Sequence, residues 1–265
     1  MSNSIRPFLK AIIFDVDGTL AETEEVHRQA FNAAFRTFGL PWQWDVETYR
    51  GLLSIGGGRE RFQAFLAQMG VRRIDPVLVA NLHQEKSRLY AARVAAGHLH
   101  ARPGVLRLLA EARAAGIRLA CATSSQRSAV TALLPSLLGS DAENTFTALG
   151  CGDDAARKKP APDIYLWVLE QLSVERPSCI VIEDTALGLA AATAAGLSTV
   201  ITVSMYSEPF NHEPQSFAEA VAVVSDLGEP NRQFTLLAGK AYGRKIVDLS
   251  LLQLWLAKVP DPMTQ

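Results

Sequence analysis

The sequence predicts an α/β protein built on a doubly wound parallel sheet, with an all-helical domain inserted after the first strand. Three observations lead to this fold class. A short apolar run over residues 9–14 ends directly in two aspartates. Residues 23–95 carry helical periodicity without a strand pattern. From residue 96 onward, β-rich runs alternate with helical segments, which is typical of parallel sheets.

The composition is typical of a globular protein, and its charge balance argues against a nucleic acid partner. The 265 residues are 48% hydrophobic and carry a formal net charge of −1, which lacks the broad basic surface that nucleic acid binding requires. Cys121, Cys151 and Cys179 lie in or beside apolar runs without metal-like spacing, so we expect buried, reduced thiols. We expect a cytoplasmic monomer whose partner is a small molecule, neither nucleic acid nor membrane.

One uncharged stretch, between Thr185 and Ser207, is long enough to suggest a membrane span. Gly188 and Gly196 interrupt it, and its pattern changes from Ala-rich to Val/Ile/Thr-rich. We therefore expect a helix that stops at the second glycine, followed by a strand. The apolar stretch near the N-terminus is too short for a signal peptide, so we expect none.

The inserted domain is expected to contain only helices. Apolar residues three and four positions apart predict a helix from residue 22 to about 38. Further helices are expected over 46–53, from 59 onward, and from Pro76, a favourable first helical residue, to about 96. The core then comprises residues 1–22 and 96–230, and the inserted domain comprises residues 23–95.

The core elements alternate in type. Their order along the chain predicts helices over 103–115, 126–134, 162–172 and 186–195, and strands over 117–122, 147–151, 179–182, 199–203 and 221–224. The last of these is expected to complete the sheet. Residues 231–265 are expected to form an extension that docks on the core, with a hairpin-like piece over 242–249 and an apolar-faced helix after it.

Polar groups gather at three predicted strand ends. Asp15 and Asp17 follow the first strand, Thr123 follows strand 117–122, and Glu183 and Asp184 follow strand 179–182. Parallel strands bring these ends to one edge of a sheet. Four carboxylates gathered there repel one another unless a cation binds, and oxygen ligands favour Mg²⁺. Each group taken alone is equally consistent with a turn or a helix cap.

A phosphate group bound at this edge would also need hydrogen-bond donors. Thr123 and the backbone N–H groups after it, at the start of a helix, can supply them. Lys159 adds a positive charge on a loop that Pro160 and Pro162 stiffen. Taken alone, this lysine could equally be a solvated surface residue.

The order of these groups resembles the four motifs of the haloacid dehalogenase-like (HAD) hydrolases. The matching segments are Asp-Val-Asp-Gly-Thr at 15–19, Thr123, Lys-Pro-Ala-Pro-Asp at 159–163 and Glu-Asp-Thr-x-x-Gly at 183–188. The resemblance covers most of residues 9–203. It implies a HAD-like Rossmannoid core, with residues 23–95 as a type-1 (C1) cap. Because this cap joins the core through two chain segments, near residues 22 and 96, we also expect a hinged closure that excludes water.

The resemblance also implies a role for each motif residue. Asp15 would be the nucleophile that forms an aspartyl-phosphate, and Asp17 the general acid and base. Thr123 and Lys159 would hold the phosphoryl oxygens. Asp17 would contribute its backbone carbonyl to the metal. The implied Mg²⁺ ligands are Asp15, Asp17, Glu183 and Asp184, with Glu183 assisting through or beside a metal-bound water.

Within the family, the sequence resembles the CbbY/β-phosphoglucomutase-like group, and its CbbY-type phosphatases in particular. The features are Asp-Gly-Thr-Leu-Ala-Glu-Thr-Glu-Glu at 17–25, then His27, then Gly-Gly-Arg-Glu-Arg at 57–61, with Arg59 where that group has lysine. This implies removal of the 1-phosphate from xylulose 1,5-bisphosphate, an inhibitor of the Calvin-cycle enzyme Rubisco. The product would be xylulose 5-phosphate.

A bisphosphate needs a second anion site, which we expect under the cap. Its candidate cations are Arg59, Arg61 and Arg127, while Glu24 and His27 could contact sugar hydroxyls. Packing or a solvated helix face is the alternative for each. The full set of expected substrate-binding residues is Glu24, His27, Arg59, Arg61, Ser124, Ser125 and Arg127.

Several other functions remain open within the same fold. A dehalogenase would lack Asp17, and a phosphonatase would need a motif around its cap lysine that Lys86 lacks. The remaining alternatives are a β-phosphoglucomutase and a broad sugar-phosphate or phosphoglycolate phosphatase. A catalytically silent HAD-type binding or regulatory protein is an alternative of a different class.

Overall fold

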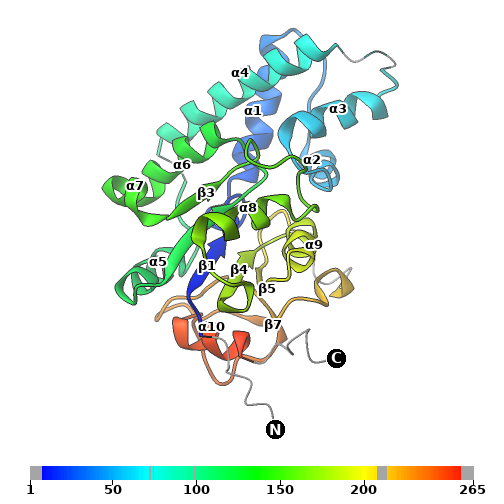
Figure 1. Ribbon diagram of the computed structural model, residues 1–265. Helices are drawn as coiled ribbons and strands as arrows, with labels where there is room; N and C mark the ends of the chain where they lie inside the picture. Colours follow the sequence, from blue (N-terminus) through cyan, green and yellow to red (C-terminus); the bar gives the residue numbers. More distant parts are fainter. Residues whose placement is uncertain (1–7, 72, 74, 98, 208–213, 258–265) are drawn as a thin grey trace.

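The computed structural model describes residues 8–71, 73, 75–97, 99–207 and 214–257 (Figure 1). The expected core and C-terminal extension also include residues 1–7 and 258–265, which lie outside the described residues. The described residues form one seven-stranded sheet with the order β3-β2-β1-β4-β5-β6-β7. Its parallel strands are β1 (Ala11–Phe14), β2 (Arg118–Ala122), β3 (Ala148–Gly150), β4 (Cys179–Glu183), β5 (Ser198–Thr202) and β6 (Ala222–Val224).

The sheet is covered by helices on both faces, as its nearly continuous apolar strands require. In β1, Ile12 and Phe14 belong to the hydrophobic cluster formed with α5, α6 and α10, whereas Ala11 and Ile13 belong to the cluster formed with α8 and α9. The predicted doubly wound α/β class is therefore confirmed. The bounds of these helices are α5 (Val105–Ala114), α6 (Arg127–Leu138), α8 (Asp163–Leu172), α9 (Ala186–Ala194) and α10 (Leu249–Leu256).

The edge of the sheet differs from the prediction. Strand β7 (Leu236–Gly239) pairs antiparallel with β6, so the expectation that residues 221–224 complete the sheet is wrong. Leu236 and Leu237 are more than a third exposed, and β7 therefore lacks the buried pattern that signals a strand. The prediction of a hairpin-like piece over 242–249 is also wrong, because this segment consists of turns and irregular chain that lead directly into α10.

Four helices lie between β1 and α5 and form the upper part of Figure 1. They are α1 (Glu24–Thr37), α2 (Val46–Leu52), α3 (Gly58–Gln68) and α4 (Pro76–Ala95). The side chains of Asp45 and Asp75 cap α2 and α4 by accepting hydrogen bonds from Thr48 N and Val77 N. The helices enclose an aromatic cluster of their own, which includes Phe31, Phe35, Trp44, Tyr49, Phe62 and Phe65.

The four helices α1–α4, which we call the cap, contact the core in two places. One is where the two connecting chain segments run side by side, and the other is along α4. Ala21 and Ala101 form an antiparallel bridge, and Arg102 N donates to Leu20 O at 2.8 Å. Tyr90 and Val94, near the end of α4, are buried in the core cluster rather than in the aromatic cluster of the cap. The far end of α4 therefore packs as part of the core.

The remaining elements are short. They are α7 (Ala142–Thr145) and 3₁₀ turns at Gly139–Asp141, Arg176–Ser178 and Pro214–Phe217. The uncharged stretch forms α9 and β5 as predicted, and no described helix is both long and apolar enough to cross a membrane. Cys121, Cys151 and Cys179 are free and buried, as expected.

Candidate active site

The carboxyl ends of the central strands meet at the base of a pocket between the cap and the core. Strand β1 pairs with β2 on one side and with β4 on the other, which places Asp15, Thr123 and Asp184 at the same edge. The predicted site residues that line the pocket are Asp15, Asp17, Glu24, His27, Arg61, Thr123, Ser124, Ser125, Lys159, Glu183 and Asp184. Arg59 and Arg127 are not among its lining residues.

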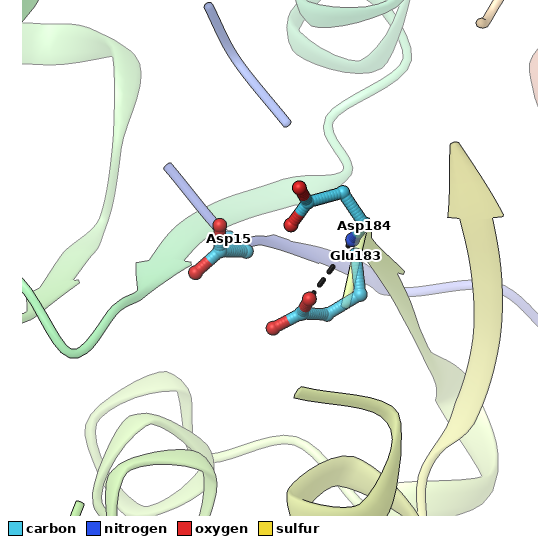
Figure 2. A group of neighbouring side chains, drawn as sticks. All are labelled: Asp15, Glu183 and Asp184. Atoms are coloured by element: carbon cyan, nitrogen blue, oxygen red, sulfur yellow. Dashed lines mark hydrogen bonds between the residues drawn. The ribbon is translucent and has the colours of Figure 1, made fainter. Parts of the chain in front are cut away.

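Three buried carboxylates form an acidic cluster (Figure 2). Asp15, Glu183 and Asp184 each offer an oxygen within 4.8 Å of the others. Burial raises the pKa of Asp15 and of Asp184, and the neighbouring carboxylates raise both further. Asp184 Oδ1 is buried and has no hydrogen-bond partner among the described residues. A hard cation with oxygen ligands fits this cluster, because it would offset the repulsion and satisfy the unpaired oxygen.

Lys159 compensates part of this negative charge. Its Nζ donates to Asp15 Oδ1 at 2.8 Å, to Glu183 Oε1 at 2.6 Å and to Ala122 O at 2.7 Å. Burial lowers the pKa of Lys159, but the charges of Asp15 and Glu183 outweigh burial and raise the pKa well above its ordinary value. The buried ammonium group therefore stays charged, and it lies next to Oδ1 of Asp15, the predicted nucleophile.

Glu183 contacts protein donors with both of its oxygens. Oε1 accepts from Lys159 and from the hydroxyl of Tyr165, the latter at 3.1 Å. Oε2 accepts from the backbone N–H groups of Asp184 and Thr185 at 2.9 and 3.1 Å. Glu183 thus lies in the acidic cluster, but its shortest hydrogen bond is the one from Lys159.

The carboxylate of Asp17 is separate from the acidic cluster. Oδ1 accepts from Thr23 Oγ1 at 2.5 Å and from His27 Nε2 at 3.0 Å, and Oδ2 accepts from the hydroxyl of Ser125. Burial alone would raise the pKa of Asp17, but His27 and the hydrogen bonds from Ser125 and Thr23 lower it below its usual range. Three hydrogen-bond donors therefore hold the two oxygens of Asp17 in fixed directions.

Lys86 completes this arrangement, although no sequence motif predicts a role for it in the site. Its Nζ lies 2.8 Å from His27 Nδ1. Since an ammonium can only donate, Nδ1 accepts and the imidazole carries its proton on Nε2, toward Asp17. The imidazole stacks on Tyr90 with ring centroids 4.0 Å apart. Its position in the sequence could have indicated this role. Lys86 is the one lysine of residues 23–95 and lies four residues before Tyr90 on the same helix.

Lys86→Met should lower kcat/KM about tenfold, because His27 loses the donor that sets its tautomer and hence its hold on Asp17. Burial lowers the pKa of Lys86 to about 8, so removing this enclosed charge should leave the melting temperature unchanged or raise it. Steady-state kinetics and thermal unfolding measure both effects. Lys240→Met, at an exposed position, is the control. Unchanged kcat/KM in Lys86→Met would contradict the assigned contact.

Arg61 and Lys86 give the cap side of the pocket a positive charge. Arg61 is 9% exposed and donates to Tyr49 Oη at 3.0 Å and to Leu52 O at 3.2 Å. Tyr49 in turn donates to Glu24 Oε2 at 2.6 Å. Among the described residues, no carboxylate forms a direct ion pair with Arg61 or Lys86, and Arg61 contributes to the lowered pKa of Lys86. Two buried, mutually repelling cations favour an anion in the pocket.

The other two predicted arginines lie elsewhere. Arg127 donates to Asp154 Oδ2 at 2.6 Å and to Leu149 O at 3.0 Å, and its side chain is 44% exposed. Arg59 lines a neighbouring hollow together with Lys158 and Asp153. Arg50 and Tyr206 line the main pocket instead, although no motif singled them out.

The cap touches the loop that carries Lys159. A Cβ atom added at Gly56 would lie 2.6 Å from Lys159 O, closer than such atoms approach in proteins. This contact is formed by backbone on both sides, so neither partner can turn away. The absence of a side chain at Gly56 therefore allows the cap backbone to lie this close to the loop that carries Lys159.

Gly56→Ala should lower kcat/KM by about tenfold, because the added methyl group keeps the cap from reaching the Lys159 loop. The matched control is Gly51→Ala in the same cap, where an added Cβ has nothing within 4 Å. That control should keep its activity and gain slightly in stability. Equal kinetics for the two variants would show that the close approach at Gly56 is unimportant for turnover.

Known proteins are similar to this chain over most of its length. A profile of the haloacid dehalogenase-like hydrolase family matches residues 9–196. The plasmid-encoded CbbY protein of Cupriavidus necator is 42% identical over 257 residues, covering 93% of this chain and 96% of the relative. A phosphorylated carbohydrates phosphatase of Thermotoga maritima is 31% identical over 196 residues, covering 74% and 85% of the two chains.

A solved structure is similar in fold as well as in sequence. It is a variant of CbbY from Rhodobacter sphaeroides in complex with xylulose 1,5-bisphosphate, with a TM-score of 0.75 and 40% identity. The match covers 83% of this chain and 95% of that one. The family profile spans well over half of the sequence, the Cupriavidus necator relative matches nearly end to end, and a second relative is a phosphatase. The chain therefore belongs to the haloacid dehalogenase-like hydrolases and is a phosphatase of that family.

Proposed function

We propose that the enzyme is a Mg²⁺-dependent phosphatase that removes the 1-phosphate of xylulose 1,5-bisphosphate and releases xylulose 5-phosphate. One observation carries the proposal. The pocket has a carboxylate, Asp15, at its base and two buried cations, Arg61 and Lys86, on its cap side, which form no ion pair with a carboxylate of the described residues. A substrate with anionic groups at both ends fits that distribution of charge. The complex of the Rhodobacter sphaeroides relative with this bisphosphate supports the choice of sugar.

Asp15, Asp184 and the backbone carbonyl of Asp17 would hold Mg²⁺, with Glu183 beside them. Oδ1 of Asp184, which has no hydrogen-bond partner in the described part of the chain, supports this assignment. When bound, the ion neutralises charge on the phosphoryl oxygens and on the clustered carboxylates. Positioning and charge neutralisation supply most of the catalysis in phosphoryl transfer, so the remaining residues act mainly by orientation.

In the first half-reaction, a carboxylate oxygen of Asp15 attacks phosphorus and the bond between phosphorus and the sugar oxygen breaks. Lys159 and Thr123 hold the phosphoryl oxygens. Asp17 transfers a proton to the leaving alkoxide. Asp17 takes up that proton from solvent as the substrate binds, because the dianionic phosphate raises its pKa. The products of this step are xylulose 5-phosphate and an aspartyl-phosphate at Asp15.

In the second half-reaction, a water molecule attacks the phosphorus of the aspartyl-phosphate. Asp17, now ionised, takes a proton from that water. The bond between phosphorus and Asp15 breaks, which restores the carboxylate and frees inorganic phosphate. His27, with its proton on Nε2, keeps Asp17 directed at the reacting oxygens in both steps.

The second phosphate group would bind on the cap side. Of the three arginines expected there, only Arg61 lines the pocket. We therefore place this site at Arg61, Lys86 and Arg50, and leave Arg59 and Arg127 outside it. Glu24 lines the same wall and could accept hydrogen bonds from sugar hydroxyls.

The proposal is tested by phosphate release from a panel of sugar mono- and bisphosphates, with Mg²⁺ and with a chelator. We expect the highest kcat/KM for xylulose 1,5-bisphosphate and none above background with the chelator. A preference for phosphoglycolate or for many monophosphates would contradict the substrate but keep the phosphatase. Isomerisation of glucose 1-phosphate by a stable aspartyl-phosphate would identify a mutase instead.

We also propose that the enzyme works as a cytoplasmic monomer on a small-molecule substrate, with no nucleic acid or membrane partner. A phosphorylated sugar substrate and buried, reduced cysteines support the cytoplasm. Light scattering coupled to size-exclusion chromatography should give the mass of one chain, and fractionation of cells should place the enzyme with the cytosol. A dimeric mass would contradict the first part of this proposal.

A further inference from the structure

Tyr206 belongs to the core by position and to the cap by packing. It lies in the loop that follows β5, yet its side chain is part of the aromatic cluster of the cap. Its ring meets that of Tyr49 edge-on, with centroids 5.8 Å apart and planes at 86°. Tyr206 is 4% exposed and lines the active-site pocket. A side chain of the core therefore completes the cap wall of the pocket.

The hydroxyl of Tyr206 fixes this position. It donates to Glu25 Oε2 on α1. Arg28 holds the same carboxylate through two hydrogen bonds, at 2.9 Å from Nε and 2.6 Å from Nη2, and donates to Trp44 O at 2.6 Å. Hydrogen bonds to an ionised carboxylate are stronger than neutral ones. The ring of Tyr206 is thus anchored to the cap and does not depend on packing alone.

Arg50 lies against the ring of Tyr206. Its Cζ is 5.7 Å from the ring centroid, within the range of a cation–π contact. Arg50 lines the pocket and is exposed, and among the described residues no carboxylate pairs with its guanidinium. A guanidinium held by an aromatic ring keeps its N–H groups free. Tyr206 therefore holds Arg50 without using the donors that an anion would need.

We propose that Tyr206 is a specificity-determining residue, which favours substrates with a second phosphate by holding Arg50 at the pocket. The inference rests on the proposed function, since it concerns the second anion of the same site. Tyr206 comes from the core and Arg50 from the cap. Their contact forms only when the two lie against each other, so the second phosphate is recognised in the closed enzyme. A monophosphate has no second phosphate group to which Arg50 could bind.

The test compares kcat/KM for xylulose 1,5-bisphosphate and for xylulose 1-phosphate. Any effect of a substitution on cap closure that is the same for both substrates cancels in the ratio of the two kcat/KM values. We expect Tyr206→Leu and Arg50→Gln each to lower the ratio about tenfold, and the double variant to lower it no further. Tyr206→Phe keeps the ring and should keep most of the ratio. Met205→Ala, 65% exposed in the same loop, is the control and should not change it.

The outcomes separate the two proposals. A wild-type ratio near one would overturn the proposed function and the role of Tyr206 together. A high wild-type ratio that Tyr206→Leu leaves intact would overturn only the role of Tyr206. Additive losses in the double variant would do the same, because they would mean that the two residues act independently. Melting temperatures verify folding, and Tyr206→Met replaces the leucine variant if that variant does not fold.

Discussion

Asp15→Asn is expected to lower kcat by at least about 10⁴-fold while the protein stays folded. The amide has no charge with which to attack phosphorus, although its oxygen can still accept the hydrogen bond from Lys159. The substitution also removes one of three crowded carboxylates, so it relieves repulsion in the metal-free protein. Phosphate release measures the loss, and circular dichroism with thermal unfolding measures the fold.

The control for this variant is Asp141→Asn, which removes a carboxylate whose partner is the exposed Arg113. It should behave like the wild type, because exposed ion pairs contribute little. A second observation is available from trapped intermediates. Wild-type protein quenched in acid during turnover should carry one phosphoryl group on the peptide that contains Asp15. Near-normal turnover by Asp15→Asn would exclude Asp15 as the nucleophile.

Asp184→Asn is expected to weaken Mg²⁺ binding by at least about 100-fold, or about 2.7 kcal/mol, and to lower turnover by about 10³-fold. Asp184 carries the one buried carboxylate oxygen of the described cluster that lacks a hydrogen-bond partner. A neutral amide in its place cannot compensate a divalent cation. Isothermal titration calorimetry with Mg²⁺ alone measures this loss without reference to activity.

The same variant should change stability in opposite directions with and without the metal. Without Mg²⁺, Asp184→Asn should melt higher than the wild type, since a buried charge beside Asp15 and Glu183 is removed. Added Mg²⁺ should raise the melting temperature of the wild type but not that of the variant, because only a bound ligand stabilises the folded state. Equal Mg²⁺ stabilisation of both proteins would place the ion elsewhere.

Much of the site could be predicted because its residues follow strands. An apolar strand that ends in Asp15 and another that ends in Asp184 must present both carboxylates at one edge once the strands are parallel neighbours. The same reasoning places Thr123 at the end of β2. Local pattern and a general rule of topology were sufficient for these positions.

The elements that local pattern missed owe their structure to distant partners. Strand β7 is largely exposed and forms because β6 leaves an unpaired edge beside it. Arg127 was expected near the substrate because it follows the Thr123 loop, but the fold supplies Asp154 as its partner. Sequence adjacency to a motif does not determine which way a long side chain turns.

The sequence by itself determined the α/β class, the inserted helices and most of the strand-end residues that line the pocket. These features depend on periodicity and on strand ends, which are local properties. Only the tertiary structure decided that Lys86 meets His27 and that Tyr206 meets Arg50. Those pairs are separated by tens to more than a hundred residues. Lys86 meets His27 because α4 packs against α1 within the cap, and Tyr206 meets Arg50 because a loop of the core packs against the cap.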